Sequence, residues 1–406
     1  MDTKVAVSYS TVHDSFKAGS EMSHKALSEA GLKKCQFAFV FASSEYDSKE
    51  LLKGVISVLG KKTLIVGGTS AGVITGDYMG YEGFHAGILL IESDEIFFNT
   101  SPAEKLNDGE YEAGLRLGKY ISSLGIIKNP NLLLLYDGMR SDPESNIPLY
   151  EAVPLLAGIK SEIDIWPPVA GVGFSLGLDK RKTEVWDNRN IFEDSAIALV
   201  ISGNVRMDTT IMHGLRPASD YHKITKATKN ILFEFDGRPA IEVAEEYLGN
   251  PEEINWANAS YLITMGVNKG EKYGPFVEDN YLNRMILGVD QNTGALIAIE
   301  GDLNVGDEFQ FMRRCGETDM VADMAQRLLD SLVNRKPLFA FYISCLGRVK
   351  KFFGTEKEES DEIRNVIGPR MPLIGIYSGV EIARIRDEVI PLDWTGVLCV
   401  FSKPVE

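Results

Sequence analysis

The hydrophobic positions of this chain follow one layout that occurs three times. In each copy, a short apolar run leads through a polar loop and an amphipathic helix to a glycine-opened turn, and a second apolar run returns as part of a hairpin. By subtraction of residue numbers, the runs and glycines lie 30, 39 and 37 residues apart, and the glycines and returns 20, 25 and 21. Repetition on this scale predicts a fold built from copies of one supersecondary unit. The runs are residues 37–41, 132–135 and 338–342, the turns 67–72, 171–175 and 375–379, and the returns 87–91, 196–200 and 396–400.

The helix of the first copy has both a buried face and a start signal. Apolar residues recur at helical spacing over 48–59, which predicts a helix that packs on a sheet. Asp47 with Glu50 has the spacing of a capping box at its start, and Thr355 with Glu358 repeats this spacing in the last copy. The two helices are therefore expected to begin in the same way.

The order of elements predicts the fold class. A strand, a covering helix and a neighbouring strand form a right-handed parallel crossover, and the hairpin that follows adds antiparallel strands. We therefore expect an α/β fold of mixed sheets covered by helices, built from repeated strand–helix–strand–hairpin units. Because the pattern changes after the middle copy, we expect two domains, 1–205 and 206–406, with the boundary within 205–236. In the second domain, further strands are predicted over 230–236, 260–266 and 283–289, with a turn at 290–294.

The composition argues against several classes of binding partner and several cellular compartments. A formal charge of −16 on 406 residues, without a basic stripe, argues against a nucleic-acid partner. Residues 1–15 lack the apolar core of a signal peptide, and no apolar run approaches the ~18 residues that a membrane span needs. The four cysteines form no CxxC pair, so we expect neither a disulfide scaffold nor a zinc site. These observations predict a cytoplasmic protein that binds no membrane and no metal.

Three segments carry a family resemblance. The loop Gly67-Gly68-Thr69-Ser70-Ala71-Gly72, the segment Ile343-Ser344-Cys345-Leu346-Gly347-Arg348 and the segment 375–382, Gly-Ile-Tyr-Ser-Gly-Val-Glu-Ile, occur in this order. They resemble the small-residue loop, the Ser-Cys-x-Gly-Arg motif and the Gly-Phe-Tyr motif of the FIST family, whose proteins carry FIST N and FIST C domains. Residues 286–296 are also similar to a strand–turn–strand segment of that family, and the resemblance spans roughly residues 30–400. The chain departs from the family at Val73, at Val380 and near Asp393, where the family has Glu, Gly and His.

The resemblance implies a function as well as a fold. It implies an intracellular sensory protein for signal transduction that binds a small molecule, with an amino acid or a similar small carboxylate as the expected ligand. It implies no established catalysis and no cofactor. No kinase, cyclase or DNA-binding segment is evident in the 406 residues, so a signalling output is expected to need a downstream protein partner. An enzyme that uses the loop 345–348 and an assembly module without a ligand remain alternatives.

The last copy carries the strongest candidates for ligand contact. Ser344, Cys345, Gly347 and Arg348 follow an apolar strand, and the carboxyl ends of parallel strands are where α/β sheets present ligand sites. The guanidinium of Arg348 is a rigid fork suited to a carboxylate. The structural alternative is an arginine that caps a helix or pairs with a nearby glutamate.

The next strand of the last copy ends in further candidates. Tyr377, Ser378 and Glu381 follow it, and Glu381 supplies the acid that a ligand ammonium would need. A surface glutamate and a tyrosine packed on the sheet are the alternative.

Outside the last copy, two places could contact an anion. Thr69, Ser70 and Gly72 form a nest of small residues whose backbone N–H groups could cradle it, with tight hairpin packing as the alternative. Arg284 begins a strand and is a second candidate for such a contact.

Catalysis has weak support in the sequence. A nucleophilic Cys345 would need a base and a lowered pKa, yet the chain has five histidines and none lies near it in sequence. His213 and His222 are nine residues apart and have no partners at metal-ligand spacing. We therefore expect no catalytic residue.

Overall fold

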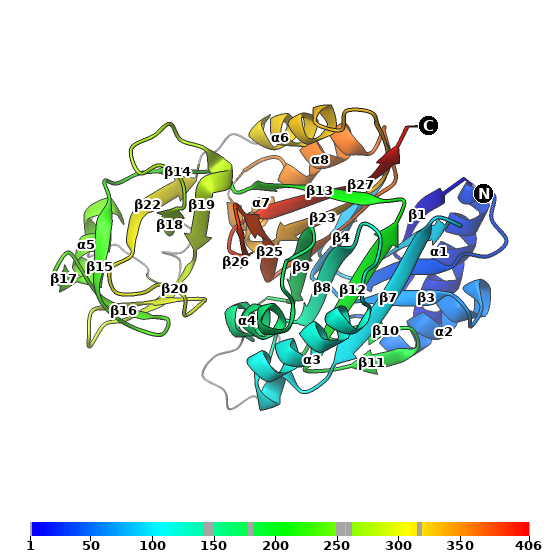
Figure 1. Cartoon of the computed structure of the whole chain (residues 1–406), viewed down its shortest axis with the longest axis horizontal. Helices are drawn as coiled ribbons and strands as arrows, with labels where there is room; N and C mark the ends of the chain where they lie inside the picture. The colour runs from blue at the N-terminus through cyan, green and yellow to red at the C-terminus, as the bar shows by residue number, and fades with distance from the viewer. Residues whose placement is uncertain are drawn as a thin grey trace.

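The described part of the chain forms four β-sheets. The computed structural model describes residues 2–140, 149–177, 182–248, 256, 262–314, 319–353 and 355–405. Three sheets have six strands each and contain one parallel pair, whereas the fourth has nine antiparallel strands. In Figure 1 the fourth sheet forms a lobe at the left, and the other three sheets form a body at the right that holds both chain ends. The prediction of mixed sheets covered by helices is confirmed.

Each of the three repeats supplies eight elements in one order: strand, helix, strand, helix, strand, two hairpin strands and a return strand. The first unit is β1 Lys4–Ser10, α1 Ser15–Ala30, β2 Phe37–Ala42, α2 Ser48–Leu59, β3 Leu64–Thr69, β4 Gly72–Thr75, β5 Met79–Gly80 and β6 Ala86–Glu92. The second is β7 Ile96–Ala103, α3 Glu110–Ser123, β8 Asn131–Asp137, α4 Ala152–Glu162, β9 Val169–Phe174, β10 Val185–Asp187, β11 Asn190–Phe192 and β12 Ala196–Gly203. The third is β13 Arg206–Met212, α6 Asp319–Asp330, β23 Arg335–Cys345, α8 Glu359–Ile367, β24 Leu373–Ser378, β25 Val380–Ile385, β26 Glu388–Leu392 and β27 Gly396–Pro404, with the short helix α7 Lys350–Phe353 before α8.

The hairpins are exchanged between units. The hairpin β10–β11 of the second unit extends the first sheet, which has the order β1-β6-β2-β3-β10-β11. The hairpin β25–β26 of the third unit extends the second sheet, β7-β12-β8-β9-β25-β26, and β4–β5 of the first unit extends the third sheet, β13-β27-β23-β24-β4-β5. Every unit therefore completes the sheet of another, and the exchange closes into a ring.

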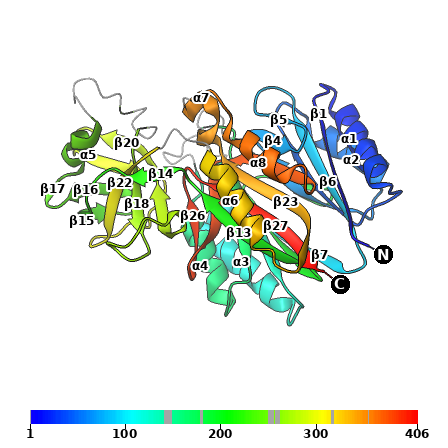
Figure 2. The same cartoon turned by 90° about the horizontal axis from the view of Figure 1, so that it is seen from above.

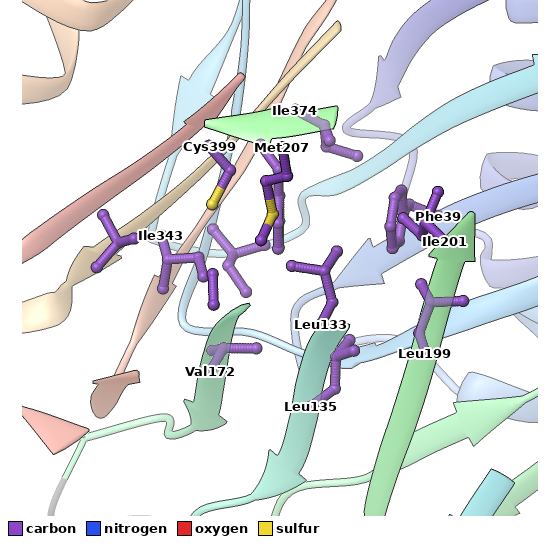
Figure 3. Packing of buried hydrophobic residues seen from close by; sticks show 14 of the residues in the cluster. Phe39, Leu133, Leu135, Val172, Leu199, Ile201, Met207, Ile343, Ile374 and Cys399 are labelled. Carbon is purple, nitrogen blue, oxygen red and sulfur yellow. The ribbon is translucent and has the colours of Figure 1, made fainter. Parts of the chain in front are cut away.

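The three six-stranded sheets enclose one apolar core. Phe39 of the first sheet stacks on Phe341 of the third at 5.6 Å between ring centroids, and Leu133 of the second sheet belongs to the same cluster. Figure 3 shows labelled side chains of all three sheets pointing toward one another in this core. Helices α1 and α2 cover the outer face of the first sheet, α3 and α4 that of the second, and α6 and α8 that of the third. Each strand pair is thus buried on both faces, as its nearly continuous apolar sequence requires.

The fourth sheet is an insertion in the third unit, between β13 and α6. Its own core is rich in phenylalanine, including Phe235, Phe309 and Phe311. Figure 2 shows it beside the body from a second direction. Its elements are β14 Leu215–Pro217, β15 His222–Thr228, β16 Ile231–Phe235, β17 Arg238–Pro239, α5 Ala240–Leu248, β18 Thr264–Asn268, β19 Tyr281–Arg284, β20 Ile286–Asp290, β21 Ala295–Ala298 and β22 Glu308–Arg314.

The two predicted capping boxes have different outcomes. The side chain of Asp47 accepts hydrogen bonds from the backbone N–H groups at positions 49 and 50, so Asp47 is the N-cap of α2. The reciprocal bond of a capping box is not formed, because the backbone N–H of Asp47 donates to Ser15 Oγ at 3.0 Å. Helix α8, however, begins at Glu359 with Glu358 as its N-cap. The hydroxyl of Thr355 instead donates to the carbonyl of Lys357 at 2.8 Å, so the prediction of a second box at Thr355 is wrong.

No helix in the described part of the chain combines the length and the apolar character needed to cross a bilayer.

Close helix crossings require glycine in two of the three units. A Cβ atom added at Gly19 of α1 would lie 2.2 Å from the carbonyl oxygen of Leu51 in α2. In the second unit, a Cβ atom at Gly114 of α3 would lie 2.1 Å from the carbonyl oxygen of Leu155 in α4. The backbones of these helix pairs approach too closely for any side chain at the crossing.

Replacing Gly19 by alanine is expected to lower the free energy of unfolding by ~1–3 kcal/mol, because the helices must separate to admit the methyl group. Urea denaturation followed by circular dichroism measures this. Gly288→Ala is the matched control, since a Cβ atom there meets nothing within 4 Å. The control should change stability by no more than about 0.5 kcal/mol. Equal stabilities for the two variants would contradict the close crossing.

Candidate functional site

The first parallel strand of each unit ends in a buried polar residue. Ser43, Asp137 and Cys345 take equivalent positions at the ends of β2, β8 and β23. Each backbone N–H donates to the carbonyl of the residue just before the return strand. The acceptors are His85, Ser195 and Thr395, at 2.9, 2.8 and 3.1 Å. The repeat therefore places three polar positions at corresponding points, and their side chains differ.

In the third unit, four of the predicted residues come together. Ser378 Oγ lies 3.0 Å from the carbonyl oxygen of Ser344 and 2.6 Å from Glu381 Oε1. The single hydroxyl proton of Ser378 cannot serve both acceptors, so both bonds form only when Glu381 is protonated and donates to Ser378. Burial also raises the pKa of Glu381 well above its ordinary value. Glu381 is thus a neutral hydrogen-bonding group, and a ligand ammonium would have to displace its present partners.

The fourth of these residues, Cys345, is also buried. Burial raises the pKa of its thiol above the ordinary value. The group is therefore a thiol rather than a thiolate at neutral pH, and the thiolate is the nucleophilic form.

Arg348 is buried and fastens three elements together. Its Nη1 donates to the carbonyl oxygens of His213 and Trp394, both at 2.7 Å, and its Nη2 pairs with Glu359 of α8. A Cβ atom at Gly347 would lie 2.1 Å from the ring of Trp394, so glycine lets this loop pack flat on the indole. A ligand carboxylate at Arg348 would have to displace Glu359.

The imidazole of His213 is neutral. Its Nδ1 accepts a hydrogen bond from the backbone N–H of Leu215 at 3.0 Å, which places the ring proton on Nε2, 3.1 Å from the carbonyl oxygen of Glu278. Burial lowers the pKa of His213 to about 4. The positive charge of the adjacent Arg348 guanidinium also favours the neutral form of the ring.

The predicted small residues of the first unit lie at the crossings between units. Ser70 Oγ lies 2.6 Å from the carbonyl oxygen of Gly72 and 3.0 Å from that of Tyr377, so the two carbonyls share its one proton. A Cβ atom at Gly72 would lie 2.4 Å from the ring of Tyr377. Thr69 Oγ1 accepts from the backbone N–H of Glu184 in the second unit at 2.8 Å. Tyr377 itself bonds Ser360 of α8 through its hydroxyl, at 2.8 Å. These residues join the first unit to both of the others.

Two adjoining hollows open where loops of the three units meet, and we call them the junction hollows. The larger has a volume of about 480 Å³ and the smaller about 250 Å³, and they share Ser44 and Leu176. Charged groups of both signs line the larger hollow together with hydroxyls: Asp47, Lys49, Lys182, Glu184, Ser48 and Thr69. The smaller is lined in part by Ser43, Ser70, Glu82, His85, Leu346 and Lys351.

Some residues that line the junction hollows were predicted from the sequence to contact a ligand, and others were not. Thr69 and Ser70 were expected from the sequence to contact a ligand, and both line these hollows. Lys182 and Glu184 were not expected. They precede β10, which reaches the first sheet only through the hairpin exchange, so no local pattern marks them.

Arg284 lies in a different place, at the joint between the fourth sheet and the body. It is fully buried, its Nε donates to Asp302 Oδ1 at 2.7 Å, and its Nη1 donates to the carbonyl oxygen of Pro391 in β26 at 3.0 Å. Glu300 accepts from the backbone N–H of Ala152 at the start of α4, at 3.1 Å. Burial raises the pKa of Glu300 to about 8. Side chains of the fourth sheet thus hold both α4 and β26.

Comparison with known families agrees with this architecture. The FIST N domain model matches residues 36–238 and the FIST C domain model residues 240–384. The chain belongs to the FIST family. FIST domains are generally sensory or ligand-binding domains of signal transduction. The two FIST domains meet within β17, so the FIST C domain begins inside the fourth sheet.

The relatives of this FIST protein extend beyond the matched region. An uncharacterised protein of Mycobacterium tuberculosis (strain H37Rv) is 23% identical over 234 residues, which are 57% of this chain and 60% of the relative. One of Mycobacterium bovis is 22% identical over 239 residues, 59% of this chain and 61% of the relative. The chain therefore covers less than two thirds of these relatives. The crystal structure of a cyanuric acid hydrolase from A. caulinodans aligns over 100% of both chains with 7% identity and a TM-score of 0.39, too low to carry an argument.

Replacing Arg348 by methionine is expected to lower the free energy of unfolding by ~3–5 kcal/mol, because the buried carboxylate of Glu359 loses the guanidinium with which it forms its salt bridge. The double variant Arg348→Met/Glu359→Leu removes both charges and should recover most of this loss. Chemical denaturation without ligand measures both. Lys53→Ala is the control, since it breaks an exposed pair with Glu50 and should cost at most about 1 kcal/mol. An unchanged stability of Arg348→Met would show that Glu359 does not need the arginine.

Replacing Glu300 by glutamine is expected to change how stability depends on pH. The raised pKa means that the folded state holds the proton, so this stabilisation is complete below pH 4.5 and is lost as the pH rises through about 8. The wild type should therefore lose stability relative to Glu300→Gln between pH 5 and 8, by at most about 1.4 kcal/mol per pH unit. Asp393 and Asp302 face residue 300 in both proteins. The effect of their own titration on stability is therefore similar in both and largely cancels in the difference. Thermal unfolding across this range checks the prediction, and parallel curves would refute it.

Proposed function

We propose that this FIST protein is an intracellular sensor whose ligand is an amino acid or a similar small carboxylate, held in the junction hollows. The observation that carries the proposal is the mixture of charges in the larger hollow. Lys49 and Lys182 can meet a carboxylate, while Asp47 and Glu184 can meet an ammonium group. A small zwitterion needs both signs of charge within a few ångströms, and a volume of about 480 Å³ accommodates it with water.

Lys182 is the residue best placed to bind the carboxylate. Its side chain is 64% exposed, and its Nζ lies 2.8 Å from Glu193 Oε1 and 3.6 Å from Glu184 Oε1. It can therefore turn to a ligand without leaving a buried charge unpaired. A charge-assisted hydrogen bond of this kind contributes about 1.5–3 kcal/mol. The hydroxyls of Ser44 and Thr69 line the same hollow and supply neutral partners.

The position of the hollows supports a sensory role. Ser70 of the first unit, Leu176 of the second and Leu346 of the third all line the smaller hollow. A ligand in the larger hollow would touch the first and second units, and the smaller hollow beside it brings in the third unit at Leu346. Binding would therefore stabilise one arrangement of these loops over others. A partner protein that recognises that arrangement would provide the signalling output.

Thermal-shift measurements against the common amino acids and small carboxylates test the proposal. A ligand at 100 times its Kd should stabilise the wild type by about 2.7 kcal/mol. Lys182→Ala should lose this response while it keeps the unliganded melting temperature, because the side chain is exposed. Lys226→Ala is the matched control, since Lys226 is 62% exposed and pairs with Glu234 in the fourth sheet.

Three results would change the conclusion. If no compound stabilises the wild type, the ligand class is wrong. If Lys182→Ala responds as the wild type does, the ligand does not use this hollow. A response that survives Lys182→Ala but is lost in Arg348→Lys would place the ligand at the loop 344–348.

A further inference from the structure

We propose a second binding site, for an amphipathic organic cation, in the cleft between the fourth sheet and the body. This site is independent of the junction hollows. The cleft has a volume of about 440 Å³, in the range of pockets that hold small organic molecules. In Figures 1 and 2, α4 and β26 lie on the side of the body that faces the fourth sheet.

The walls of the cleft are apolar and come from three parts of the chain. The second unit supplies α4 and the tryptophan that follows it, the third unit supplies β26, and the fourth sheet supplies the opposite wall. An apolar surface of this size, enclosed on several sides, favours a hydrocarbon or aromatic group over water. The main apolar side chains are Leu156, Trp166, Ile390, Pro391, Leu282 and Leu303.

The carboxylates of the cleft select the charge of the ligand. Asp302, Asp307, Asp387 and Glu388 line it, against two lysines, Lys160 and Lys269. Both lysines already have acceptors. Lys269 pairs with Glu388 at 3.1 Å, and Lys160 Nζ donates to the carbonyl oxygens of Ile163 and Asp164.

Two of the four acids remain available to a ligand. Within the described residues, Asp307 and Asp387 form no salt bridge, and Asp307 accepts one hydrogen bond, from the backbone N–H of Asn304 to its Oδ2 at 2.7 Å, which leaves its Oδ1 to a ligand. Asp302 is paired with Arg284, but each of its oxygens has a further lone pair to offer. A positively charged head group therefore finds acceptors here, whereas a carboxylate would meet like charge.

Trp166 adds a further reason to expect a cation. Trp166 lines the cleft and is 9% exposed. The face of an indole ring attracts a cation, and this attraction is strongest among the aromatic side chains. The cleft thus combines a carboxylate, an indole and an apolar wall.

A ligand in this cleft would act on the joint between the lobes. Asp302 lines the cleft and also holds Arg284, whose Nη1 bonds the carbonyl of Pro391 in β26. Its apolar part would contact α4 and β26 on one side and the fourth sheet on the other. Binding would therefore hold the fourth sheet against the body.

Titration of the full-length chain with hexylammonium, followed by tryptophan fluorescence and by calorimetry, tests the proposal. We expect saturable binding that weakens as salt is added, with hexanoate and 1-hexanol binding at least about tenfold more weakly. Trp166→Phe should remove the fluorescence change and keep the calorimetric signal. The other tryptophans, Trp186, Trp256 and Trp394, do not line the cleft.

Two further variants test the location without touching the buried pair of Asp302. Ala157 is exposed on α4 and lines the cleft, so Ala157→Trp should fill the space and abolish binding. Asp307→Asn/Asp387→Asn should weaken hexylammonium about threefold or more, while the exposed Asp77→Asn and the junction variant Lys182→Ala should not. Hexanoate binding as tightly as hexylammonium, or unchanged affinity in Ala157→Trp, would overturn the proposal.

Discussion

Each unit of this protein leaves one edge of its parallel strand pair to be completed by a hairpin from another unit. The edge of β3 is paired by β10, the edge of β9 by β25 and the edge of β24 by β4. An unpaired edge would expose a row of backbone N–H and C=O groups and uncover the common core beneath it. No unit can therefore reach its native sheet alone, and the ring of three exchanges is the constraint on which the remaining structure depends.

The exchange explains why the most distinctive sequence of the chain is made of small and buried polar residues. At one crossing, the backbone N–H of Gly379 donates to the carbonyl of Gly173 at 2.9 Å, and a Cβ atom at Gly379 would lie 2.5 Å from the Cβ atom of Ser175. At another crossing Ser70 bonds the backbone of Tyr377, and nearby Arg348 fastens the end of β23 to α8. Much of the FIST resemblance thus lies on residues that hold units together. The hollows open beside these crossings, and their charged groups come from residues outside the motifs.

The sequence predicted the helices and strands better than it predicted which strands pair with each other. The three copies, the mixed sheets and the cap at Asp47 follow from local periodicity and turn chemistry. Hairpin pairing does not, because Val185 pairs with Gly68 and Ile374 with Thr75 across more than a hundred residues. For the same reason Lys182 and Glu184 were missed, although Thr69 beside them was expected. For Arg348, the structure shows the alternative that the sequence left open, a pair with a nearby glutamate.

The fourth sheet breaks the symmetry of the ring at one place. It is inserted only in the third unit, and Arg284 and Glu300 attach it to β26 and to the start of α4. The hairpin β25–β26 completes the second sheet. A change in the position of the fourth sheet would therefore be transmitted through this hairpin and through α4 to the three exchanged sheets. The carboxyl of Glu300 holds its proton near neutral pH, so this attachment does not place an uncompensated charge in the joint. The insertion therefore contacts only one side of a nearly symmetric body. Ligand binding at the insertion would act on that side, whereas ligand binding in the junction hollows would act between the units.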